Sequence, residues 1–148
     1  MAAPVPQAPA IAAVLRHTAS AVATFVRRER WRPGMAAEAA ASHVDDTYLS
    51  TRLDQRAGEL AYALLRERLG DRFLWCTEDQ EEWGQGPADA ELIVVADPVD
   101  GTAFSPPGRP DYGACCLTVF DRASNCLACA VADLYSPTVF WCQGLSGG

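Results

Sequence analysis

Apolar residues recur with a helical period in the first half of the chain and as strand-like runs in the second half. From Pro9 to Trp31 they recur at the spacing of one face of an amphipathic helix. Pro33 and Gly34 end this pattern, because neither residue favours the continuation of a helix. The apolar positions of this predicted helix are Ile11, Leu15, Val22, Phe25 and Val26.

A second amphipathic helix is predicted from Arg52 to Leu69. Gly70 follows it and suits the left-handed conformation that commonly ends a helix. Thr51 is the expected N-cap, and Asp54, three residues later, gives a pattern close to a capping box. The apolar stripe consists of Leu53, Ala57, Leu60, Ala61, Leu64 and Leu65.

Several short apolar runs after the second helix are predicted to be strands, and Asp121–Asn125 is predicted to be a hairpin turn between two of them. Two helices followed by strands indicate an α+β fold, with two N-terminal helices packed on a mostly antiparallel β-sheet. The helices should cover one face of the sheet, and the other face would need a further layer. The predicted strands are Phe73–Thr77, Leu92–Ala96, Gly113–Phe120, Leu127–Ala132 and Thr138–Cys142.

The chain has 148 residues, which is enough for one domain with a substantial core. Residues 1–8 are expected to be a disordered tail, residues 9–143 to form the domain, and residues 144–148 to be a flexible end. No internal repeat is evident.

The net charge of −7 argues against sequence-independent nucleic-acid binding, which needs a basic surface. Met1–Ala10 lacks the charged leader and apolar core of a signal peptide. No apolar stretch is expected to reach membrane-spanning length. The sequence therefore favours a reduced, cytoplasmic protein without a nucleic-acid or membrane partner.

Six cysteines raise the question of disulfides or a zinc site, and neither is expected. Cys115 and Cys116 are adjacent, and Cys126 and Cys129 stand in apolar runs typical of strands. Residues three apart in a regular strand face opposite sides, so Cys126 and Cys129 should not share an ion. Because free cysteine packs like a small hydrophobe, we expect these residues to be packing residues.

The candidate functional residues lie in the segment Asp97–Thr102, whose sequence is Asp-Pro-Val-Asp-Gly-Thr. This segment directly follows the apolar run Leu92–Ala96. The segment is expected to be a tight turn that holds two carboxylates close together. Two such carboxylates repel each other unless a cation lies between them, and oxygen ligands suit Mg²⁺. Amides around Gly101 can point at an anion. Ordinary turn chemistry is the alternative interpretation of the same residues.

The segment Ala96–Thr102 resembles the Asp-Pro-x-Asp-Gly-Thr signature of the inositol monophosphatase family, which belongs to the Mg²⁺-dependent, lithium-sensitive phosphatases. Thr77–Asp79 is similar to the family's Gly-Glu-Glu segment, and Leu49–Gln55 to its Val-Thr-x-x-Asp segment. Thr77 and Asp79 depart from the usual residues. The resemblance implies the first half of the family's layered sugar-phosphatase fold, because the Trp-Asp-x-x-Ala segment of the second half is missing from these 148 residues.

The resemblance also implies a metal site. Glu78 and Asp97, with the carbonyl of Val99, would bind a first Mg²⁺, and Asp97 and Asp100 would share a second. Glu78 has an alternative role as one more solvated acid in an acidic loop. A Ca²⁺-binding loop over Glu78–Glu91 is disfavoured, because the alternating oxygen ligands and turn glycine of such loops are missing.

The phosphate-binding and catalytic residues are implied in the same way. Asp100, Gly101 and Thr102 would bind the substrate phosphate, and Thr102 with Glu78 and Asp54 would orient the attacking water. Asp54 has an alternative role as a carboxylate at a helix N-terminus, and Thr102 as the cap of a short helix.

The resulting hypothesis is Mg²⁺-dependent hydrolysis of a small phosphate monoester by a chain expected to form a dimer. The alternative is a catalytically incomplete half-domain that acts as an interaction or regulatory module, because an uncovered sheet face would expose apolar surface.

Overall fold

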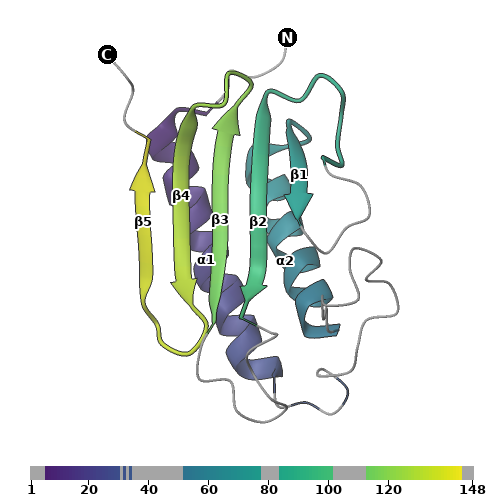
Figure 1. Cartoon of the computed structure of the whole chain (residues 1–148), viewed down its shortest axis with the longest axis vertical. Coiled ribbons are helices and arrows are strands. Elements are labelled where there is room, and N and C mark those ends of the chain that lie inside the picture. Colours follow the sequence, from purple (N-terminus) through teal and green to yellow (C-terminus); the bar gives the residue numbers. More distant parts are fainter. Residues whose placement is uncertain are drawn as a thin grey trace.

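Two helices cover one face of a five-stranded sheet (Figure 1). The computed structural model describes residues 6–30, 32, 34, 52–77, 84–101 and 113–144. The elements are α1 (Ala8–Glu29), α2 (Arg52–Leu69), β1 (Phe73–Thr77), β2 (Leu92–Asp100), β3 (Ala114–Asp121), β4 (Cys126–Asp133) and β5 (Val139–Gln143). The predicted α+β class is therefore confirmed.

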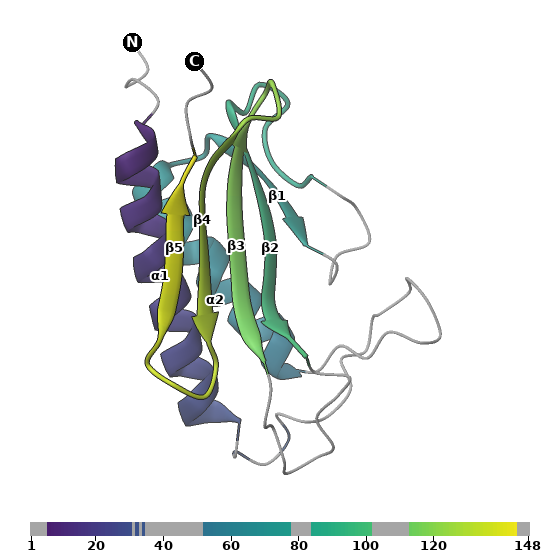
Figure 2. The ribbon, with the colours of Figure 1, turned by 60° about the vertical axis from the view of Figure 1, so that its left-hand side comes forward.

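The strands lie in chain order across the sheet, β1-β2-β3-β4-β5. β1 pairs with β2 in parallel, and every later pair is antiparallel, so the sheet is mostly antiparallel as predicted. Both helices lie on the same side of the sheet, and in the described part of the chain the other side carries no layer (Figure 2). We call these the helix face and the outer face of the sheet.

The helices follow the predicted apolar stripes. α2 has the predicted bounds, and Gly70 follows it with φ +70° and donates its N–H to the Arg66 carbonyl at 2.9 Å. α1 begins at Ala8, inside the expected tail, and ends at Glu29, just before the expected end near Trp31. Residues 1–5 and 145–148 lie outside the described residues, so the predictions of a disordered tail and a flexible end stay predictions there.

α1 corrects one expectation, because its 22 residues are long and apolar enough to cross a membrane by length and composition alone. Its apolar positions are nevertheless the ones that face the sheet: Ile11, Leu15 and Val22 are fully buried in the core. A core helix passes the same test of length and composition, and the burial of these side chains identifies α1 as one.

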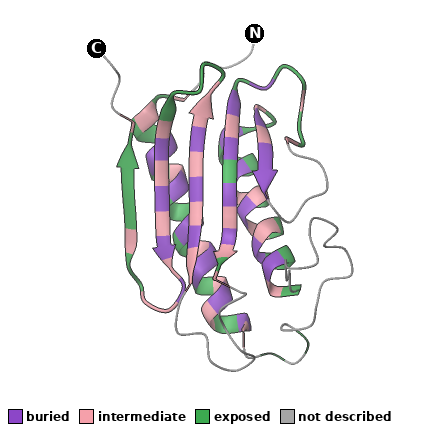
Figure 3. Ribbon diagram, viewed as in Figure 1, coloured by how far each residue is buried: buried purple, intermediate pink, exposed green. Residues whose placement is uncertain are grey.

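Burial alternates along the central strands, as Figure 3 shows by the banding of β2, β3 and β4. Side chains of β3 and β4 that face the helices, such as Leu117 and Ala130, are fully buried, whereas their neighbours on the outer face are half-buried. Outer-face residues Val95 and Phe140 are 36% and 68% exposed. The core therefore sits between the helices and one face of the sheet.

The hairpin between β3 and β4 overturns the expectation about two cysteines. Val119 pairs with Ala128 but Phe120 pairs with Cys126, so one extra residue on β4 shifts the register. Thr118 pairs with Cys129. Directly opposed residues share a face, so Cys126 and Cys129 lie on the same face of the sheet.

The loop between β4 and β5 is organised by the Asp133 carboxylate. It accepts hydrogen bonds from the N–H groups of Tyr135 and Ser136, at 2.7 and 3.1 Å, and from the Ser136 hydroxyl at 2.8 Å. Arg27 of α1 donates to the carbonyls of Asp133 and Ser136. The Tyr135 N–H, followed by the Ser136 hydroxyl, lowers the pKa of Asp133 below its ordinary 3.8.

This arrangement predicts a pH-dependent contribution of Asp133 to stability. Because its folded pKa is lowered, the contribution is present above the unfolded pKa and is lost as pH falls through the folded value. Asp133→Asn should lower the free energy of unfolding by about 1 kcal/mol at neutral pH. In urea titrations the difference from wild type should shrink below the unfolded pKa of about 4. A difference in the free energy of unfolding that stays constant into strong acid would contradict this role. The variant Asp89→Asn, at an exposed position, removes the same charge and serves as the control.

Candidate active site

The strand that leads into the two aspartates is longer than predicted. β2 does not end at Ala96 but continues through Asp97, Pro98 and Val99 to Asp100. The expected tight turn at Asp97 is therefore wrong, and the chain turns only at Gly101, whose φ of +99° favours glycine.

A register shift within β2 decides where the carboxylates point. Asp97 pairs with Cys116 and Asp100 pairs with Ala114, so three steps along β2 match only two along β3. In a regular strand residues three apart would face opposite sides, but the extra residue of a bulge restores the same side. Asp97 and Asp100 therefore share the outer face of the sheet.

The Cys116 thiol lies beside these carboxylates. Cys116 lies on the outer face of β3, and its pKa is raised to about 11, first by burial and then by the charges of Asp97 and Asp100. A half-buried thiol whose pKa is raised by the charges of both carboxylates lies close to each of them. Two negative charges gathered in this way are the electrostatic setting of a cation site.

Pro98, between the two aspartates, faces the helices and connects β2 with α2. A Cβ atom placed on Gly58 of α2 would lie 3.7 Å from the Pro98 Cγ atom, so the proline ring packs against the helix where it has no side chain. Asp54 lies one helical turn before Gly58 and therefore on the same side of α2. This contact ties the carboxylate-bearing end of β2 to the helix that carries Asp54.

A pocket of about 390 Å³ opens beside this contact, between α2 and β1. Asp54 contributes a carboxylate that is only 3% exposed. Thr77, also 3% exposed, has a hydroxyl without a hydrogen-bond partner among the described residues. The pocket is lined by Asp54, Gln55, Gly58, Glu59, Tyr62, Trp75, Thr77 and Gln85.

The structure accounts for part of the predicted site. Asp97 and Asp100 come together on the outer face, with Val99 between them on the same strand and Gly101 at the turn that follows. Asp54 lines the pocket at the other side of β1 and β2. Glu78 and Thr102 lie outside the described residues, so their predicted roles stay predictions.

The described residues of the predicted metal site offer oxygen atoms that suit a hard divalent cation. Two carboxylates on one face and the carbonyl of Val99 are oxygen ligands, which Mg²⁺ prefers. The neighbouring Cys116 is half-buried on the same face, and its burial together with the two carboxylates raises the pKa of its thiol. No group of three acidic, histidine or cysteine side chains that could hold a metal ion occurs among the described residues, and the predicted third acid, Glu78, lies outside them.

Sequence reasoning missed three residues of this region. They are Gly58, Thr77 and Cys116, and each reaches the site through contact between segments far apart in the chain. Gly58 does so where α2 packs on β2, Thr77 where β1 lies beside α2, and Cys116 where β3 pairs with β2. For Thr77 and Gly58 a weak signal existed. Thr77 immediately precedes the predicted ligand Glu78, and Gly58 interrupts a helix without ending it.

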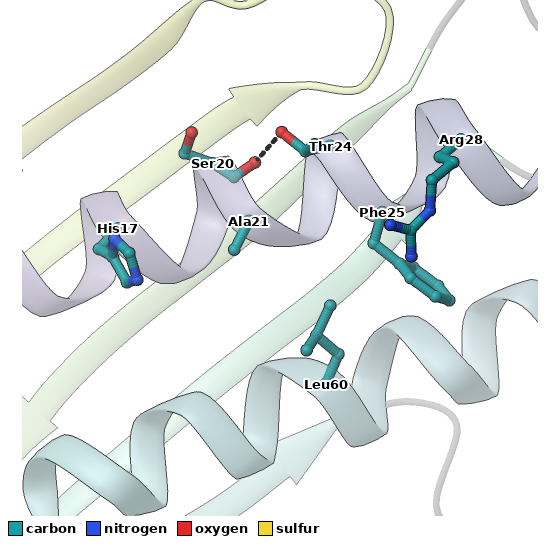
Figure 4. Close-up of a pocket in the computed structure, with 7 residues that line it drawn as sticks. All are labelled: His17, Ser20, Ala21, Thr24, Phe25, Arg28 and Leu60. Atoms are coloured by element: carbon teal, nitrogen blue, oxygen red, sulfur yellow. Dashed lines mark hydrogen bonds between the residues drawn. The ribbon is translucent and has the colours of Figure 1, made fainter.

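A second cavity lies between the helices, on the side of the sheet opposite to the aspartates (Figure 4). It measures about 370 Å³, and its polar groups include His17, Thr24 and Arg28. The Thr24 hydroxyl donates a hydrogen bond to the Ser20 carbonyl at 2.8 Å. None of the residues that line it is acidic, so it does not suit a divalent cation. The outer-face aspartates remain the stronger candidate.

No protein-family profile matches the chain, and no curated protein sequence matches it either. Solved structures do match. The extragenic suppressor protein suhB from Bartonella henselae aligns at 18% identity and a TM-score of 0.70, over 90% of this chain and 48% of that protein.

Two further solved structures match the chain over a similar length. A Ca-bound IMPase family protein from Staphylococcus aureus aligns at 12% identity and a TM-score of 0.69, over 93% of this chain and 49% of that one. CysQ from Bacteroides thetaiotaomicron, described as a bacterial member of the inositol monophosphatase family, aligns at 17% identity and a TM-score of 0.63, over 95% and 48%.

These structural matches confirm that the chain has the fold implied by its resemblance to the inositol monophosphatase family. At such low identity they establish a shared architecture and not a shared activity. The chain spans about half the length of the solved structures that it matches.

Proposed function

We propose that this chain contributes a Mg²⁺ and phosphate site to the hydrolysis of a small phosphate monoester, as the first half of a phosphatase of the inositol monophosphatase type. One observation carries the proposal: the register shift in β2 places Asp97 and Asp100 on the same face of the sheet, beside the half-buried Cys116 of β3. The shared fold and the sequence motifs support the same conclusion.

Each residue has a task in this proposal. Asp97, Asp100 and the Val99 carbonyl would hold the cation, together with Glu78. Bound Mg²⁺ would lower the pKa of a coordinated water and neutralise charge on the phosphate oxygens. Gly101, whose positive φ turns the backbone at the end of β2, offers its N–H to the phosphate.

The remaining chemistry is positioning of the attacking water. Thr102 and Glu78 would accept hydrogen bonds from that water, and a carboxylate there could take up its proton as a general base. Asp54, which is nearly buried in the first turn of α2, would help to position them. The substrate class is a small phosphorylated metabolite, and we place the protein in the cytoplasm.

The proposal is tested by measuring Mg²⁺-dependent phosphate release from a panel of small phosphate monoesters. Release should require the divalent ion and should cease with EDTA. Release that is indifferent to EDTA would contradict the proposal. The decisive variant, Asp97→Asn, is treated in the Discussion.

A second candidate function is an interaction module, and exposed apolar side chains favour it. Phe140 and Val95 lie on the outer face at 68% and 36% exposure, and β5 is an edge strand. An apolar face and an open strand edge both promote association. We propose that two copies of the chain associate through this face.

Association predicts a dimer whose stability depends on Phe140. Light scattering after size exclusion should give twice the mass of the 15.9 kDa chain at high concentration. Phe140→Ser should shift this equilibrium to the monomer by about tenfold in dissociation constant, because a buried aromatic anchor is lost. Ala63→Ser on the exposed side of α2 is the control and should leave the mass unchanged. A wild-type chain that stays monomeric would reject the proposal.

A further inference from the structure

Two cysteine thiols face each other across the last strand pair of the sheet. Cys129 of β4 and Cys142 of β5 are direct register partners, and their Sγ atoms lie 3.2 Å apart. β5 forms the edge of the sheet beside β4 (Figure 1). This contact with the Cys142 thiol is the largest cause that raises the pKa of Cys129.

The backbone around this pair already has the dimensions of a disulfide. Gly144 donates its N–H to the Leu127 carbonyl, and Asp133 donates to the Thr138 carbonyl. Hydrogen-bonded pairs alternate along an antiparallel ladder, so Cys129 and Cys142 occupy a hydrogen-bonded pair, with Cα atoms about 5.5 Å apart. Disulfides are most common at Cα separations of about 5.5–6 Å. A bond between these sulfurs therefore needs only side-chain rotation.

The same pair is open to a small reagent. Cys142 is exposed on the edge strand, and Cys129 is half-buried next to it. Cys76 and Cys115 are buried, and Cys116 is half-buried beside Asp97.

Cys126 is exposed like Cys142, but its register partner is Phe120 and not a cysteine. The chain thus contains one exposed thiol with a cross-strand cysteine opposite it, and one exposed thiol opposite a phenylalanine, which serves as a matched control.

We propose that Cys129 and Cys142 form a reversible disulfide by exchange with a low-molecular-weight disulfide such as oxidised glutathione. The Cys142 thiolate attacks one sulfur of the reagent, forming a mixed disulfide and releasing one glutathione thiolate. The Cys129 thiolate then attacks the Cys142 sulfur and releases the second glutathione. Two electrons pass from the protein to the reagent, and the two protons from the cysteines end on the two glutathione thiols.

The bond would fasten the edge strand to the sheet. β5 pairs only with β4 among the described strands, so its unpaired side is an open edge. A covalent link between β4 and β5 restricts the opening of that edge and closes the loop from Cys129 to Cys142. The pair would thus act as a redox-sensitive clasp on the most exposed strand of the fold.

The experiment uses the fully reduced 148-residue chain exposed to oxidised glutathione, followed by intact mass and a count of titratable thiols. The wild type should lose the mass of two hydrogens and two titratable thiols, and peptide mapping should link Cys129 to Cys142. Dithiothreitol should restore both thiols. Hydrogen exchange of β5 should slow in the oxidised form.

Variants separate the clasp from unspecific oxidation. Cys126→Ser should behave as the wild type. Cys129→Ser should instead retain one glutathione on Cys142, because the resolving thiol is gone. A wild-type chain that keeps a stable glutathione adduct on Cys142, or that links two chains through this cysteine, would overturn the proposal. These readouts do not depend on phosphatase activity.

Discussion

Asp97→Asn is expected to lower Mg²⁺-dependent phosphate release by at least about 100-fold, since loss of a metal ligand costs more than the 10- to 100-fold typical of supporting residues. Asp97 is the residue assigned to both metal positions, and the substitution removes its charge while keeping its size. The shift of register in β2 should persist, because it depends on backbone pairing and not on this side chain. Initial rates at saturating Mg²⁺ measure the effect.

A metal-binding readout makes this prediction independent of the rest of the enzyme. Binding of Mn²⁺, a paramagnetic substitute for Mg²⁺, is followed by electron paramagnetic resonance on the 148-residue chain and should weaken by a similar factor. Asp89→Asn removes one negative charge from an exposed turn and should leave both readouts unchanged. If Asp97→Asn and Asp89→Asn affect Mn²⁺ binding equally, the carboxylate pair is not a cation site.

Gly58→Val is expected to weaken the same site by up to about 100-fold without touching a ligand, because misplacement by about 1 Å can cost that much. A β-branched side chain is stiff, and its γ-carbons would press against the Pro98 ring, which lies 3.7 Å from the position of a Cβ atom on residue 58. Overpacking of this kind also costs about 1–3 kcal/mol of stability. Mn²⁺ affinity and urea midpoints measure the two effects.

Gly58→Ala is the matched control. Its single methyl group would sit at an ordinary contact distance from Pro98, and alanine raises helix propensity by about 1 kcal/mol over glycine. The alanine variant should therefore be as stable as the wild type or more stable, with full Mn²⁺ affinity. Equal loss of affinity in both variants would show that the helix, and not the contact with β2, had been disturbed.

Periodicity located the elements well where local physics governs. α2 has the predicted bounds because an apolar stripe, a first-turn aspartate and a glycine at the C-terminus act within one segment. The hairpin at Asp121–Asn125 was also predictable, since the Asp121 carboxylate accepts hydrogen bonds from the N–H groups of Ala123 and Asn125. These interactions involve residues close in the chain.

Both sequence-based errors about strand faces have the same origin. The expected turn at Asp97 is an extension of β2, and Cys126 and Cys129 share a face that regular alternation would deny them. In each case one strand carries an extra residue that has no partner on its neighbour. Such a register shift depends on how two strands pair, so the regular alternation assumed from the sequence of one strand does not predict it.

The sequence by itself determined the order and type of the elements, the shared fold and the identity of the acidic candidates, because apolar period and local turn chemistry act along the chain. Only the tertiary structure decided that Asp97 and Asp100 share a face, that Pro98 packs on Gly58, and that Cys129 meets Cys142. The reason is physical: these relations are set by pairing register and packing between segments far apart in the chain, which local propensity does not encode.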